Sequence, residues 1–190
     1  MTSLPPSCVQ ALADLRVFLT TCWEWTHEVH YARSFPRKDP RPTIPSTYMC
    51  RHTSRMLLEL LDGVDQGWKL SGGTMKPLDD REPQPHWWIE KDGVIIDLTA
   101  DQFGWDPITV VPTSDIRYQA LPEAASKSWI RGLTTTMATW RGMASRDWMD
   151  HDPQFQALAQ ASAPALAAFQ TQWKEGLAPS GPVAFDRLRP

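Results

Sequence analysis

The sequence lacks the features of several large classes of protein. Lys and Arg total 19 against 22 Asp and Glu, so the net charge is −3, and no long basic run occurs. Proteins that bind nucleic acid by neutralising phosphates usually carry a basic patch, so we expect no nucleic-acid partner. No apolar run approaches the ~18 residues of a membrane span, and the N-terminus lacks the pattern of a secretory signal. We therefore expect a cytoplasmic protein without a membrane partner.

Cysteine is scarce, and the three cysteines are Cys8, Cys22 and Cys50. An odd number with no Cys-x-x-Cys pair argues against a disulfide framework and fits a reducing compartment. Cys22, His27 and His30 lie close in sequence, but no second pair completes a tetrahedral metal site, and the histidines lack the spacing of a zinc protease. We expect neither a metal nor an organic cofactor.

Length and composition predict a folded α+β protein. The chain has 190 residues, of which 42% are hydrophobic, so it can bury a core of ordinary size. We expect residues 1–115 to form the core, with an N-terminal helix, a second helix that starts near Cys50, and a β-hairpin. Residues 116–190 are expected to form a helical extension packed on the same domain.

Helical spacing of apolar residues occurs in the ranges 9–31, 46–62, 123–144 and 153–175. In the second range Ser46 or Thr47 is a suitable N-cap, and Gly63 can take the left-handed conformation that often follows a helix. Prolines exclude a helix over 34–46. Pro164 interrupts the last range.

Strands are predicted at 66–71, 86–91, 94–99 and 108–113. The first ends at a pair of glycines. Asp92-Gly93 joins the second to the third, and Asp-Gly between two strand-like runs is typical of a type I′ hairpin turn. A two-residue turn places Trp88 opposite Asp97. His86 then lies on the same face as Asp97, diagonal to it and about 7 Å away at the Cα atoms.

Three residues in this arrangement predict thiol chemistry. Cys50 is expected in the first turn of its helix, where the partial positive charge favours a thiolate and the free N–H groups can stabilise an oxyanion. His86 is the expected base, and Asp97 the carboxylate that orients its ring.

Other polar and aromatic residues lie near these three. Tyr48 and Trp88 are candidates for the substrate pocket, and Gln102 is a candidate oxyanion donor. Each also has an ordinary structural role, as a packed aromatic ring or a polar turn residue. Asp101 is an alternative carboxylate partner for the histidine, and His52 is an alternative base.

The order of these residues resembles the catalytic core of transglutaminase-like proteins. The matching pieces are Cys50, His86-Trp87-Trp88 and Asp97-Leu98-Thr99. Papain-like peptidases and arylamine N-acetyltransferases share that broader fold and its thiol–imidazole pair. Residues 92–103 also resemble a stretch of small uncharacterised phage and bacterial proteins. The resemblance covers about 46–103, and it implies a class of chemistry without a substrate.

Two functions follow as hypotheses. The first is a thiol hydrolase or acyltransferase (a peptidase, amidase or transglutaminase-type enzyme) acting on the amide, ester or thioester carbonyl of a protein, peptide or small acyl substrate. The second is a non-catalytic module that binds a protein partner or a larger assembly, such as that of a phage. In the second case Cys50 is a buried apolar residue, as most free cysteines are.

Overall fold

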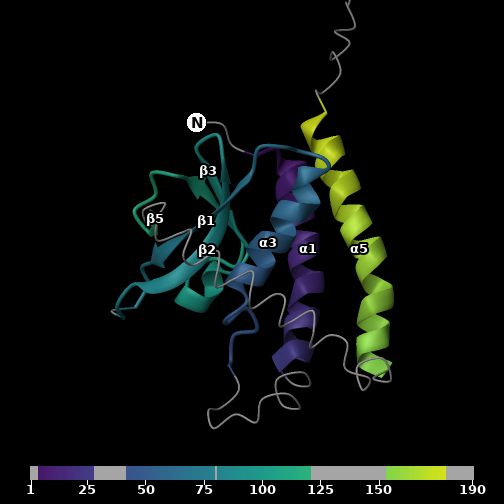
Figure 1. Cartoon of the computed structure of the whole chain (residues 1–190), viewed down its shortest axis with the longest axis horizontal. Coiled ribbons are helices and arrows are strands. Elements are labelled where there is room, and N and C mark those ends of the chain that lie inside the picture. Colours follow the sequence, from purple (N-terminus) through teal and green to yellow (C-terminus); the bar gives the residue numbers. More distant parts are fainter. Residues whose placement is uncertain (1–3, 28–41, 80, 121–152, 179–190) are drawn as a thin grey trace, which may run out of the picture.

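Helices and a sheet form separate layers of this protein. The computed structural model describes residues 4–27, 42–79, 81–120 and 153–178. Its helices are α1 (Pro6–Trp25), α3 (Cys50–Asp62) and α5 (Pro153–Leu177), with a short 3-10 helix, η2 (Ala100–Phe103). Its strands are β1 (Lys69–Met75), β2 (Gln84–Lys91), β3 (Val94–Asp97), β4 (Thr109–Pro112) and β5 (Tyr118–Ala120). Figure 1 shows α3, α1 and α5 on one side of the sheet. The predicted α+β class is confirmed.

The sheet is antiparallel throughout, in the order β4-β3-β2-β1-β5. Asp92 and Gly93 both have positive φ, 48° and 81°, as a type I′ turn requires. The pairs across the turn are Lys91–Val94, Glu90–Ile95 and Ile89–Ile96. The predicted hairpin and its register are confirmed, although β3 ends at Asp97 and the predicted strand 94–99 is two residues too long. β4 lies within the predicted strand 108–113.

β1 corrects the predicted end of its strand, because it continues through the glycine pair to Met75. Both glycines are sites of close approach. A Cβ on Gly73 would lie 2.0 Å from the carbonyl oxygen of Gln119 in β5, and one on Gly72 would lie 2.9 Å from the Trp87 ring. Gly73 therefore allows β5 to add to the edge of the sheet, Gly72 leaves room for the Trp87 ring, and neither glycine ends the strand.

The start and the end of α3 differ from the prediction. The helix begins at Cys50, and its N-cap is Met49, with no side-chain cap hydrogen bond; the predicted Ser46 or Thr47 cap is wrong. The chain also leaves the helix in a right-handed conformation, because Gly63 has φ −80°. The N–H groups of the next two residues return to the Leu61 carbonyl at 2.9 and 2.7 Å, so this turn needs no left-handed residue.

The two longest helices pack against each other. α1 begins at Pro6, earlier than the predicted 9–31, because proline fits the first turn of a helix, where its missing N–H has no partner to lose. α5 confirms the predicted helix 153–175, but the predicted interruption at Pro164 is wrong, because the helix continues through this residue. The predicted helix 123–144 lies outside the described residues. None of the helices described is both long and apolar enough to cross a bilayer.

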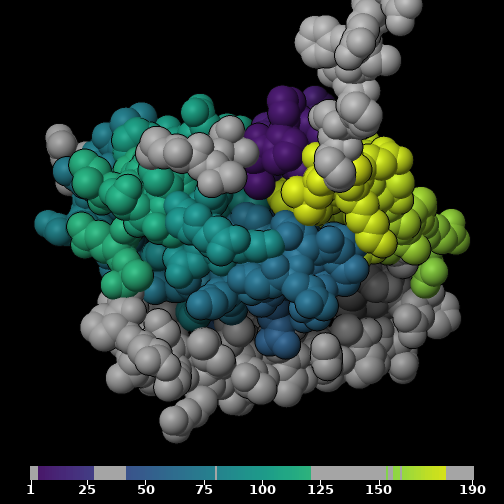
Figure 2. All heavy atoms as spheres, turned by 90° about the horizontal axis from the view of Figure 1, so that it is seen from above, coloured from purple at the N-terminus to yellow at the C-terminus, as the bar shows by residue number. Residues whose placement is uncertain are grey.

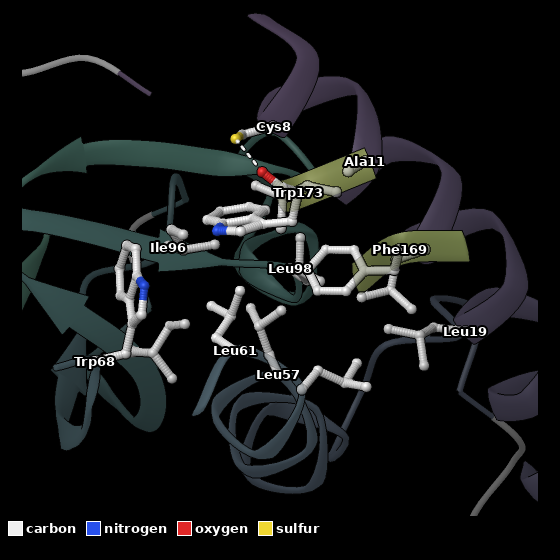
Figure 3. Packing of buried hydrophobic residues seen from close by; sticks show 14 of the residues in the cluster. Cys8, Ala11, Leu19, Leu57, Leu61, Trp68, Ile96, Leu98, Phe169 and Trp173 are labelled. Carbon is white, nitrogen blue, oxygen red and sulfur yellow. Dashed lines mark hydrogen bonds between the residues drawn. The ribbon is translucent and has the colours of Figure 1, made fainter. Parts of the chain in front are cut away.

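Each face of the sheet has its own buried cluster. The helix-covered face includes Leu57, Ile96, Phe169 and Trp173, drawn in Figure 3. Trp173 is fully buried, and its replacement by alanine would lower the free energy of unfolding by about 3–5 kcal/mol. The second cluster, on the other face, consists of Met75, Trp88, Ile95, Ala100, Phe103 and Tyr118. In Figure 2 the strands and α5 lie at opposite ends, with α3 between them.

Candidate active site

The hairpin brings a histidine and a carboxylate into direct contact. His86 Nε2 and Asp97 Oδ2 are 2.5 Å apart, and both side chains are fully shielded from solvent. The geometry follows from the Asp92-Gly93 turn, because side chains alternate faces and the register sets their offset. The structure therefore bears out the predicted proximity of these two residues.

Asp97 accepts three further hydrogen bonds. Its Oδ1 accepts from the backbone N–H and the hydroxyl of Thr99 at 2.8 and 2.9 Å, and its Oδ2 accepts from the Tyr118 hydroxyl at 2.9 Å. Burial raises the pKa of Asp97, but His86 and Thr99 outweigh burial and lower it below its ordinary value. Burial and the Asp97 charge raise the pKa of Tyr118, so the phenol remains a donor. No pattern in the sequence pointed to Tyr118, which lies on a strand of three residues.

His86 carries one free ring nitrogen. Burial lowers the pKa of His86, but the charge and hydrogen bond of Asp97, together with Cys50, outweigh burial and raise it to about 9. Nδ1 is buried and has no hydrogen-bond partner. Cys50 is one of the groups that raise the pKa of His86, and its helix α3 packs against β2, where the Ser54 hydroxyl donates to the Trp87 carbonyl at 3.0 Å. Since Asp97 occupies Nε2, Nδ1 is the nitrogen left for the thiol.

Aromatic rings surround the histidine. Phe103 lies edge-on with its centroid 4.8 Å from that of His86, and Trp88 and Tyr118 lie at 6.1 and 6.3 Å. Trp88 is buried, so its ring closes the pair from solvent without opening into a groove. In such surroundings the effective dielectric constant is low, and the His86–Asp97 interaction is stronger than it would be in water.

Cys50 lies at the start of α3, as predicted, although the helix has no side-chain cap. Only 9% of the residue is exposed. Tyr48, two residues earlier, has φ 67°, an uncommon conformation for a residue with a side chain and one that marks local strain. The Tyr48 side chain is 66% exposed, so it stands at the surface beside the entry to the helix.

A polar network ties the start of α3 to the end of the hairpin. Asp101 accepts from Ser46 Oγ at 2.5 Å and pairs with Arg16 of α1 at 2.5 Å. This explains why Ser46 does not cap α3. The alternative prediction, that Asp101 is the carboxylate partner of the histidine, is wrong. Asp101 contacts Ser46 and Arg16, and Asp97 is the carboxylate that contacts His86. The partners are 85 and 55 residues away in sequence, a separation that local patterns do not predict.

The remaining candidates lie around this centre. The Gln102 amide donates to the Thr99 carbonyl at 2.9 Å, which ties it into its own turn. His52 lines a separate cavity of about 530 Å³, and burial followed by the Arg51 charge lowers its pKa. The cavity lies between α1, α3 and α5; its walls include Phe18, Cys22, Met49, Thr53 and Leu166. His52 therefore faces this cavity, whereas the structure brings His86 to Asp97.

The residues weighed for a metal site are spread out. Cys22 lines the cavity, and the His27 Nε2 contacts the Pro45 carbonyl at 3.0 Å. His30 lies outside the described residues. Across the described ranges, no three His, Cys, Asp or Glu side chains form a metal-binding group, and the three cysteines are free thiols.

Comparison with known proteins adds no assignment to this geometry. No protein-family model matches the chain, and searches of curated proteins and of solved structures found no match either.

Proposed function

We propose that this protein is a thiol hydrolase or acyltransferase in which Cys50 is the nucleophile, His86 the base and Asp97 its orienting carboxylate. The observation that carries the proposal is a buried His86–Asp97 pair, 2.5 Å apart, whose Nδ1 has no hydrogen-bond partner, on a strand against which the helix that begins at Cys50 packs. Nucleophile, base and orienter are the three parts that activated-nucleophile catalysis needs. A transglutaminase-like or papain-like core is part of the same proposal.

Asp97 sets the direction of proton transfer. The carboxylate on Nε2 keeps a proton there, so Nδ1 is the nitrogen that exchanges a proton with the Cys50 thiol. A pKa of about 9 favours the doubly protonated imidazole that forms when Nδ1 takes the thiol proton. The resulting imidazolium faces Asp97, whose charge compensates it in a site closed to water.

The reaction then has two balanced halves. In the first, the sulfur of Cys50 attacks the carbonyl carbon and a C–S bond forms. The leaving amine, alcohol or thiol takes the Nδ1 proton as its bond to that carbon breaks. In the second, water or an amine loses a proton to Nδ1 and attacks the thioester, and the acid or amide product leaves as Cys50 regains its proton. The N–H groups at the uncapped start of α3 are the candidate oxyanion donors.

The test is labelling of the cysteines by iodoacetamide as a function of pH, read by peptide mass spectrometry. Burial raises the pKa of Cys22 to about 11, and burial followed by Asp65 raises the pKa of Cys8, so both are internal references that stay protonated at neutral pH. Cys50 should label before either of them between about pH 6 and 7.

Two variants separate catalysis from folding. His86→Ala removes the base, and His86→Gln removes it while keeping an amide that can donate to Asp97. Both should abolish the preference for Cys50, with folding checked by circular dichroism. If Cys50 labels no faster than Cys8 and Cys22 in the folded wild type, the thiol enzyme is excluded. The interaction module is then the better hypothesis.

A further inference from the structure

Arg51 differs from the other arginines in the described part of the chain. Each of the others pairs with a carboxylate, and these pairs are Arg16–Asp101, Arg55–Glu59, Arg81–Asp79 and Arg117–Asp115. Arg51 pairs with no carboxylate among the described residues. Its neighbour in sequence is Cys50, the proposed nucleophile.

The Arg51 guanidinium is partly shielded from water. Nε and Nη2 are buried and make no hydrogen bond. The charged groups that act on it are Cys50, which favours the cation, and Arg55, which opposes it; burial, the largest effect, lowers the pKa of Arg51. A charged donor that is buried without an acceptor is unfavourable, because it has lost its hydrogen bonds to water and gained none in the protein. Such a group is typical of a binding site and not of a structural tie.

The two unpaired atoms define a shape. Nε–H and Nη2–H lie on the same edge of the planar guanidinium and point in parallel. This edge matches the two oxygens of a carboxylate, which it binds with two hydrogen bonds. Arg51 is also the second residue of α3, where the helix dipole adds to the attraction for an anion.

We propose that the Nε–Nη2 edge of Arg51 binds a carboxylate of the substrate next to Cys50, so that the preferred acyl donors are anionic. The proposal rests on the proposed function of Cys50 and adds a substrate class to it. Arg55, one turn further along α3, is not a second anchor because its Nε donates to Glu59 at 3.1 Å.

Two alkylating reagents of nearly equal size test this preference. Iodoacetate and iodoacetamide react in the same way: the Cys50 sulfur displaces iodide from the methylene carbon, and the thiol proton passes to His86 or to solvent. Only iodoacetate carries a carboxylate. The measured quantity is the ratio of the two labelling rates at Cys50, divided by the same ratio for glutathione.

In the wild type the normalised ratio of the iodoacetate rate to the iodoacetamide rate should be about 5 to 10. This is the scale expected for a charge-assisted pair that is partly shielded from water. Arg51→Gln should bring the ratio close to one. Arg51→Lys should give a ratio between one and the wild-type value, because lysine keeps the charge but lacks the two parallel N–H groups. Arg55→Gln, with the same change of charge one turn away, should leave the ratio as in the wild type.

A wild-type experiment removes any dependence on how the variants fold. Succinate should slow the reaction of Cys50 with iodoacetamide, and the neutral succinamide should not. An equal ratio in wild type and Arg51→Gln, or equal protection by the two compounds, overturns the anion site while Cys50 stays reactive. Lack of reaction with both reagents in the wild type instead overturns the proposed function, and the anion site with it.

Discussion

Two carboxylates in this fold each accept several hydrogen bonds, at opposite ends of the hairpin. Asp65 follows α3 and accepts from the indole nitrogens of Trp68 and Trp173 at 2.8 and 3.2 Å, and from Lys91. It joins the turn after α3, the end of β2 and α5. Its side chain keeps 13% of its surface exposed, and that of Lys91 keeps 22%.

Asp97 has a similar number of donors in a different setting. It accepts from His86, Thr99 and Tyr118, and no part of its side chain reaches solvent. One donor, His86, is titratable, with a pKa raised to about 9, and its Nδ1 has no hydrogen-bond partner. The comparison teaches that the number of hydrogen bonds does not separate a structural tie from a reactive site. What distinguishes the reactive site is a titratable partner, His86, with a ring nitrogen that makes no hydrogen bond.

The largest difference is expected when each carboxylate is removed. Asp97→Ala should lower the free energy of unfolding by about 3–5 kcal/mol, because it leaves half of a buried pair without its partner. Asp65→Ala should lower it by about 1–3 kcal/mol, since water can reach the donors it leaves. Urea denaturation measures both values.

Labelling of Cys50 sharpens the same contrast. The preferential reaction of Cys50 should be lost in Asp97→Ala and kept in Asp65→Ala under conditions where both variants are folded. If Asp65→Ala also removes the preference, the two carboxylates do not have separate roles.

The second expected difference is in pH dependence. The pKa of His86 is raised from 6.5 to about 9, so its contribution to stability is complete below pH 6.5 and is lost as pH rises through 9. The loss should amount to about 3 kcal/mol, by the conversion of 1.36 kcal/mol per pKa unit. The lowered pKa of Asp97 acts at the acid end, where its contribution is lost as pH falls through the folded value.

Urea denaturation at several pH values measures this dependence. The fall between pH 6.5 and 9 should persist in Asp65→Ala, because Asp65 contacts no histidine in the described structure, and it should disappear in His86→Gln. A wild-type stability that is constant over this range would contradict the buried His86–Asp97 ion pair.

The smallest effect is expected from Tyr118→Phe. This variant removes one of the four hydrogen bonds to Asp97 and should lower the free energy of unfolding by about 1.5 kcal/mol. Because the His86 contact remains, Cys50 should still label ahead of Cys8 and Cys22. A loss of reactivity as complete as that of Asp97→Ala would place Tyr118 in the proton-transfer group itself.

Local signals in the sequence predicted the parts of the site that depend on one turn or one helix. Asp92-Gly93 fixed the register that brings His86 to Asp97, because a two-residue turn leaves a single pairing. The apolar face of α3 likewise predicted a helix, whereas the place of Cys50 near its start was predicted from a Ser46 or Thr47 cap that the structure does not have. These interactions need only residues that are close in sequence.

Contacts between distant segments could not be predicted in this way. Ser46 is a good N-cap by composition, yet its hydroxyl binds Asp101, whose partner on the other side is Arg16. Tyr118 reaches Asp97 only because Gly73 lets β5 approach β1. Each of these depends on tertiary packing that no local pattern records.

Transfer of an acyl group to Cys50 tests the central claim most directly. The folded protein is mixed with p-nitrophenyl acetate at neutral pH, quenched in acid, and mapped by peptide mass spectrometry while released nitrophenolate is counted. We predict a burst of about one nitrophenolate per chain with the acetyl group on Cys50, and no burst in His86→Gln. Acetyl groups on lysines alone, or an equal burst without His86, would contradict the account.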